Sequence, residues 1–152
     1  MRLARISTAI AAFFVSSPVL AEDFATVSDV ANSAALCMLS AGKDGADTSR
    51  FEGNGWTSTE DGYRHMSAPV KIEFPSDDDG IRRICVVHAA LADRKAQDEV
   101  AEVIATMLKA QPIEQSESKV WVISTANGPR GIQFFIDQDS DQPQVRLVGA
   151  AF

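Results

Sequence analysis

Apolar residues recur every three or four positions in two stretches of the chain, which predicts two amphipathic helices. The first helix is expected over residues 27–41, and Gly42 stands where a C-capping glycine commonly ends a helix. The second is expected over residues 93–109. Asp93 is a candidate N-cap for it, and Pro112 prevents the helix from continuing. These two helices are the clearest elements that the pattern predicts.

Alternating apolar and polar residues predict β-strands between and after the helices. Residues 70–74 alternate, an acidic turn containing a glycine follows, and residues 81–90 return, which is the pattern of a hairpin. Residues 84–87 are apolar at both parities, so we expect that strand to be covered on both faces. Asp47 can cap a short helix before this region. Three further runs rich in β-branched and aromatic residues predict a closing antiparallel meander: 119–125, 131–137 and 144–150.

Together these elements predict an α+β fold with two main helices packed on one face of an antiparallel sheet. The two halves of the chain also resemble each other. Each has a helix, then a tryptophan (Trp56 or Trp121), an Ile-x-Phe strand (at Ile72 or Ile132), an acidic turn and a last strand. One interpretation is a degenerate tandem of two helix-plus-β-meander units. The alternative is two ordinary halves with chance matches.

The N-terminus has the three parts of a secretory signal peptide. Arg2 and Arg5 precede a short apolar run, a proline follows, and small residues lead to a cleavage site after Ala21. The apolar run is shorter than the ~20 residues that a membrane span needs. We therefore expect export to the periplasm or the extracellular space, with residues 1–21 cleaved and residues 22–152 forming a single mature domain.

Cleavage makes an acidic chain more acidic. Of the 14 lysines and arginines, removing Arg2 and Arg5 leaves 12 against 21 aspartates and glutamates, a net charge of −9. Such a surface repels nucleic-acid phosphates and anionic lipid headgroups. We therefore expect no nucleic-acid binding and no membrane insertion after cleavage. A basic protein is the favoured partner, and the domain is expected to be a monomer.

The two cysteines, Cys37 and Cys85, are predicted to form a disulfide. Export places them in an oxidising compartment, and the chain has no C-x-x-C pair that would indicate a redox or haem-attachment motif. Cys37 falls on the apolar face of the first helix, and Cys85 falls in the strand predicted to be covered. Closing a loop of about 50 residues stabilises a fold by roughly 4 kcal/mol in the chain-entropy model. Two separate buried thiols, or a reactive thiol, are the alternatives.

The stretch DQDSD presents carboxylates at Asp137, Asp139 and Asp141, a spacing that begins many calcium-binding loops. The rest of the loop pattern is missing. The sixth position is Gln142 instead of glycine, and the twelfth is Val148 instead of glutamate. A solvated turn between strands explains the same residues. These aspartates are weak metal candidates, and we assign the chain neither a metal nor a cofactor.

Histidines offer the remaining candidate chemistry. His65 and His88 could combine with Glu73 or Asp61, but no spacing in the sequence places them together. There is no G-x-S-x-G, H-E-x-x-H or glycine-rich phosphate loop. The sequence therefore assigns no catalytic residue, and an enzyme with an unrecognised site around His65 or His88 is an alternative.

The function that these observations favour is binding. A small exported acidic domain without a recognised catalytic set is most readily a non-enzymatic interaction protein of the cell envelope, one that binds or inhibits a cationic partner. A small-molecule or metal-binding module is a further alternative. Three aromatic residues could line a binding surface, although core packing is their commoner use: Trp56, Tyr63 and Trp121.

Overall fold

A computed structural model describes residues 23–152; the predicted signal peptide and its cleavage site lie outside the described residues. The chain forms helices α1 (Val27–Ser40) and α2 (Arg94–Leu108) and a short 3-10 helix, η1 (Thr48–Phe51). Eight strands make up the rest: β1 (Trp56–Ser58), β2 (Gly62–His65), β3 (Val70–Glu73), β4 (Cys85–Ala90), β5 (Ile113–Glu114), β6 (Ser118–Thr125), β7 (Gly128–Phe135) and β8 (Gln144–Ala151).

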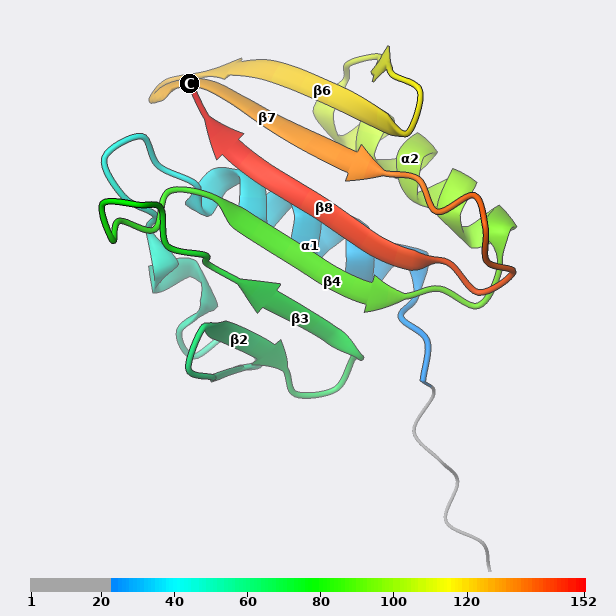
Figure 1. Cartoon of the computed structure of the whole chain (residues 1–152), viewed down its shortest axis with the longest axis horizontal. Coiled ribbons are helices and arrows are strands. Elements are labelled where there is room, and N and C mark those ends of the chain that lie inside the picture. Colours follow the sequence, from blue (N-terminus) through cyan, green and yellow to red (C-terminus); the bar gives the residue numbers. More distant parts are fainter. Residues whose placement is uncertain (1–22) are drawn as a thin grey trace, which may run out of the picture.

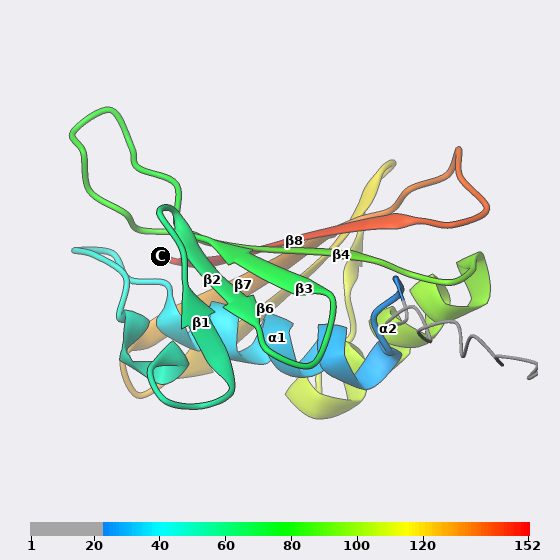
Figure 2. The same ribbon diagram turned by 90° about the horizontal axis from the view of Figure 1, so that it is seen from below.

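All eight strands join in one antiparallel sheet in the order β1-β2-β3-β4-β8-β7-β6-β5. Both helices lie on one face of this sheet, and the other face carries no helix (Figures 1 and 2). The predicted α+β fold with two helices on one face of an antiparallel sheet is therefore confirmed. Within residues 23–152, neither helix has the length and apolar character of a membrane span.

Local signals explain where the helices begin and end. Thr26 and Asp29 form a reciprocal capping box at the start of α1, and Asp93 caps α2 as predicted by accepting the backbone N–H of Ala96. Gly42 directly follows the C-cap Ala41, where a capping glycine was predicted, but its φ is not positive and its N–H donates to the carbonyl of Arg83, so it does not form the left-handed cap. Gly42 is needed for space instead, since a Cβ there would lie 1.9 Å from the carbonyl oxygen of the following turn.

The strands were predicted in part. The hairpin of β3 and β4 is confirmed, and so is the antiparallel arrangement of β6, β7 and β8. Strands β1, β2 and β5 were missed, because segments of two to four residues are too short to show alternation. Cys85, Val86 and Val87 are buried on both faces of β4, as predicted, although helices cover only one of these faces. Val86 faces the side without helices, where its neighbours on adjacent strands leave it only 4% exposed.

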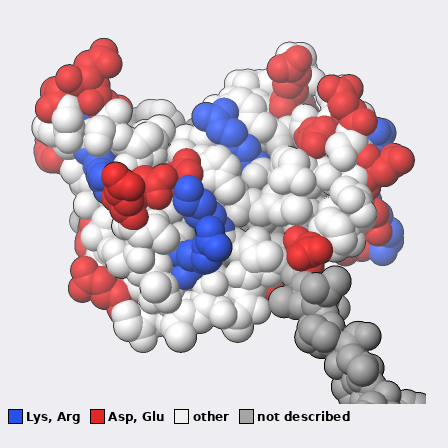
Figure 3. All heavy atoms as spheres, turned by 60° about the horizontal axis from the view of Figure 1, so that its bottom comes forward, with Lys and Arg blue, Asp and Glu red and all other residues white. Residues whose placement is uncertain are grey.

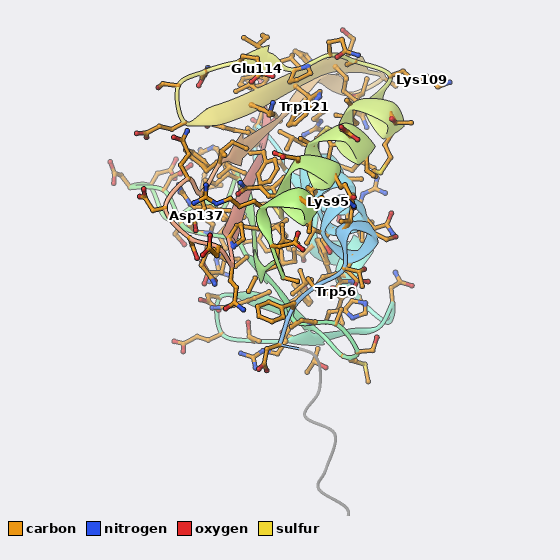
Figure 4. All side chains as sticks on the ribbon, turned by 90° about the vertical axis from the view of Figure 1, so that its right-hand side faces the viewer. Trp56, Lys95, Lys109, Glu114, Trp121 and Asp137 are labelled. Atoms are coloured by element: carbon orange, nitrogen blue, oxygen red, sulfur yellow. A yellow bond between two sulfur atoms is a disulfide. The ribbon has the colours of Figure 1, made fainter. Side chains whose placement is uncertain are left out.

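The element order repeats along the chain, as each half is a helix followed by a four-stranded meander and the two last strands, β4 and β8, pair. Ile72 and Ile132 both lie in the third strand of their unit. The matching of the two tryptophans is wrong: Trp56 lies in β1 and Trp121 in β6, near opposite edges of the sheet (Figure 4). The counterpart of Trp121 is Tyr63. Tyr63 lies opposite Ile72, and Trp121 lies opposite Ile132, the matching isoleucine of the second unit.

Helix α1 lies directly on the two central strands. The predicted disulfide is present, joining Cys37 of α1 to Cys85 of β4 with a Cα–Cα distance of 5.3 Å. Gly149 of β8 lies opposite Cys85, and a Cβ at this glycine would lie 2.8 Å from the backbone nitrogen of Met38. Only a residue without a side chain leaves room for this contact. Together with the disulfide beside it, the contact fixes the position of α1 on the sheet.

Replacing Gly149 with alanine tests this contact. The added methyl group meets helix backbone that cannot move aside alone, so we expect Gly149→Ala to lower the free energy of unfolding by about 1–3 kcal/mol. Chemical denaturation of the oxidised mature protein measures the change. The matched control is Ala150→Ser, which adds one heavy atom on the opposite face and should change stability by less than about 0.5 kcal/mol. Equal effects in both variants would contradict the close contact.

Candidate binding surface

The helices leave one face of the sheet bare, and we call it the open face (Figure 2). Alternation along each strand decides which side chains reach it. On β4, Val87 is buried under the helices, whereas Val86 and His88 point to the open face. On β8, Leu147 is likewise buried and Arg146 is exposed. The helix-facing side is thus apolar, while the open face mixes charge with apolar surface.

Five neighbouring strands place one row of side chains across the middle of the open face. The register pairs these residues in turn, each directly opposite the next: Arg64, Lys71, His88, Arg146 and Phe135. Four of the five can carry positive charge. In an acidic chain, this concentration of basic groups on one face is the most distinctive feature of the surface.

Part of the row is held by carboxylates. Lys71 donates from Nζ to Glu73 at 2.6 Å and to Asp61 at 3.3 Å, and Nε2 of His88 lies 2.9 Å from the other oxygen of Glu73. The hydrogen bond from Lys71 lowers the pKa of Glu73, and the charge of His88 lowers that pKa further. The same lysine lowers the pKa of Asp61, while both carboxylates raise the pKa of Lys71. The result is a four-residue ionic network on β3, β4 and the turn before β2.

His88 is the sequence candidate that the structure brings beside a carboxylate. A histidine oriented by Glu73 has the geometry of a general base, but a nucleophilic mechanism also needs a hydroxyl or thiol beside it. In residues 23–152 no such group is hydrogen-bonded to His88; its recorded partner is Glu73. No cluster of three metal-ligating side chains forms there either.

His65 lies elsewhere, on the helix-facing side. Its Nδ1 accepts the backbone N–H groups of Ser67 and Ala68, at 3.2 and 3.0 Å, so the ring orders the turn after β2. Its ring also packs edge-on against Trp56, with centroids 4.8 Å apart. A cleft of about 170 Å³ between this pair and α1 is smaller than the ~300 Å³ at which ligand pockets begin. His65 and His88 are not brought together.

The two remaining aromatic candidates pack against other core residues. Trp121 is fully buried between the sheet and the helices, and Tyr63 is half-buried and stacked on Phe51 at 5.3 Å. Trp56 also contacts the ring of Phe51, edge-on at 5.2 Å. These rings do not converge on a common exposed surface, so we describe them as packing residues.

An acidic loop stands at one end of the open face, between β3 and β4. Arg83 holds this loop in shape by binding Asp77 at 2.7 Å and Asp79 at 2.6 Å. The ion pair lowers the pKa of Asp79 and raises the pKa of Arg83. Asp78, at the tip, has no hydrogen-bond or ion-pair partner among the described residues and faces solvent. Its charge is therefore available to a partner.

A second acidic loop stands at the other end, between β7 and β8, and carries the three weak calcium candidates. Asp137 accepts the backbone N–H groups of Gln144, Asp139 and Ser140, which lowers its pKa. Its oxygens are thus used in the turn itself. The side chain of Asp141 is 103% exposed, 3.9 Å from Arg94. The geometry is that of a solvated turn, with Asp139 and Asp141 directed to solvent.

The two acidic loops rise from the sheet on the side away from the helices, at opposite ends (Figure 2). They connect equivalent strands of the two units, β3 to β4 and β7 to β8. Figure 3 views this side obliquely and shows lysine and arginine side chains near its middle, with acidic groups beside them and toward both ends. The open face therefore carries basic side chains in its centre, part of them paired with carboxylates, and an acidic loop at each end.

Sequence reasoning did not find Arg64, Arg146 or Phe135, which complete the row. Each is an ordinary residue in a strand, and only the pairing of strands far apart in the sequence brings them into line. A signal was nevertheless present. Arg146 interrupts the apolar run of β8, and the polar residue of a half-buried strand marks the solvent side.

The ionic network predicts a pH dependence of stability. Since the pKa of Glu73 is lower in the folded state, its contribution is present above the unfolded value of about 4.3 and is lost as the pH falls through the folded pKa. From about pH 5 to pH 3, we expect the free energy of unfolding to fall more steeply in the wild type than in Glu73→Gln. Urea denaturation at each pH measures this. In Glu117→Gln, at an exposed position, the free energy of unfolding should fall with pH as steeply as in the wild type. If it falls as steeply in Glu73→Gln, the network is refuted.

Comparisons of the chain with protein-family models, curated proteins and solved structures found no match. No activity, substrate or ligand is therefore carried over from a relative. Function has to be inferred from the surface of this domain: one bare sheet face, an acidic loop at each end and a row of charged side chains across the middle.

Proposed function

We propose that this chain is an exported, non-enzymatic binding domain that holds a basic protein of the cell envelope against the open face of its sheet. The observation that carries the proposal is the placement of the acidic loops: both stand on the bare side of the sheet, one at each end (Figure 2). Carboxylates placed in this way attract a basic partner to one face and fix its orientation there.

The centre of the open face supports the same proposal. A solvated sheet face is usually polar, yet several outward residues here are apolar or aromatic: Val86, Val122, Phe135, Val148 and Ala150. Val122 is 48% exposed. An apolar floor with a charged rim is the usual composition of a protein interface, in which burial supplies affinity and charge supplies specificity.

An exported location also supports the proposal. The disulfide between Cys37 and Cys85 is consistent with an oxidising compartment. Many envelope proteins are exposed to variable ionic conditions, so a fold fixed by a covalent bridge suits a binding domain there. Binding that begins with charge attraction should weaken as salt screens it.

Neutralising the exposed rim carboxylates tests the proposal. The triple variant Asp78→Asn, Asp139→Asn and Asp141→Asn removes three negative charges while leaving the loop-holding aspartates in place. Capture of basic proteins from envelope extract, at about 50 mM salt, should fall about tenfold relative to wild type. Captured proteins are identified and quantified by mass spectrometry.

The control removes the same charge from the helix side, with Glu52→Gln, Asp98→Asn and Glu102→Gln, all exposed. This variant should capture as much partner as the wild type does, and raising salt to about 500 mM should release the partner from both. If the two triple variants lose capture equally, net charge alone drives binding and the open face has no special role.

A further inference from the structure

We infer that the row across the open face is a carboxylate-binding site, centred on Arg146 and His88, and that its occupant is an acidic side chain on the basic partner. This inference rests on the proposed function and specifies the partner further. The partner presents basic groups at two ends of its contact surface and a carboxylate between them. The row and the two acidic loops together have the complementary pattern.

The row is unfavourable for the isolated fold. Arg64 lies directly opposite Lys71, and both side chains are cationic. Like charges at directly opposed positions of a sheet destabilise it. Glu73 and Asp61 offset the charge of Lys71, but in residues 23–152 no carboxylate lies within ion-pair distance of Arg64 or Arg146. An anion from another molecule would complete the row.

Arg146 is arranged to receive that anion. Its guanidinium lies over the ring of Phe135, 4.7 Å from the ring centre, and this stacking holds the flat group in place. No hydrogen bond joins it to another group in the described part of the chain, so its N–H donors remain available. A guanidinium held in one orientation binds a carboxylate through two parallel hydrogen bonds. His88, on strand β4, lies directly opposite Arg146, and both side chains point to the open face.

The surroundings of the row favour a single carboxylate over a polyanion. A membrane surface or a nucleic-acid strand would carry its phosphates over the acidic loops as well as over the row, and those loops would repel them. A protein that is basic overall meets no such repulsion when it places one aspartate or glutamate at the centre. Charge complementarity therefore identifies the occupant as a protein side chain.

Two matched peptides test this inference on the mature protein. KKGKKEKKGKK carries one central glutamate, KKGKKQKKGKK carries glutamine there, and both extend from the centre of the face toward the loops at ~3.3 Å per residue. Isothermal titration or NMR should show the glutamate peptide binding about tenfold more tightly, as expected for a charge-assisted pair. Arg146→Ala should abolish this preference, and Arg146→Lys, which keeps the charge without the planar fork, should reduce it. Arg50→Ala, an exposed arginine on the helix side, should leave it unchanged.

The outcomes separate this inference from the proposed function. If both peptides bind the wild type equally and the rim triple variant weakens both, the acidic loops bind basic partners but the carboxylate site is wrong. If neither peptide binds, both proposals fail. A preference for glutamate that survives in Arg146→Ala overturns the assignment of the site. Tighter binding of inorganic phosphate or of phosphatidylglycerol vesicles than of the glutamate peptide overturns the protein side chain as occupant.

Discussion

The close contact of α1 with the two central strands determines the layout of this domain. The disulfide joins the helix to β4, and Gly149 lets the helix backbone approach β8 within van der Waals distance. Arg130 of β7 donates to the carbonyl of Ala41, which satisfies an acceptor at the C-terminal end of the helix. Since these contacts join the helix to both units, α1 lies across the middle of the sheet and α2 packs beside it.

Placing both helices on one side leaves the other side bare, and the strand register then sets its chemistry. Alternation directs the large apolar side chains of β3, β4, β7 and β8 toward the helices and their neighbours away from them. In the centre, His88 and Arg146 face outward because Val87 and Leu147 face inward. A slip of one residue in either strand would exchange the two sets. The packing that stabilises the core therefore also builds the open face.

Local signals were enough to predict the helices, the main strands and the bridge. Caps such as Asp93, helical periodicity and the pairing of two cysteines in an exported chain each depend on nearby residues or on simple counting. The error at Gly42 arose because a glycine can be required for space as well as for a left-handed conformation. Strand β1 was missed because three residues show no period, and this also misplaced Trp56 in the repeat.

The candidate site was less predictable for a different reason. The acidic turns were visible in the sequence, but their position on one face depends on the layers, and the row depends on the register of five strands. Arg64 and Arg146 are 82 positions apart in the numbering, and only long-range pairing places them in line. The sequence indicated that the surface is acidic, without indicating where on the fold its charges gather.

The central claim is that the open face, and not the helix side, meets the partner. Hydroxyl-radical footprinting of the mature protein, alone and with the protein it captures, tests this claim most directly. The account predicts reduced labelling of His88, Val122 and Phe135 on the open face, with unchanged labelling of Leu39 and Met107, which are exposed on the helices. Protection of the helix residues with unchanged labelling of the open face would contradict it.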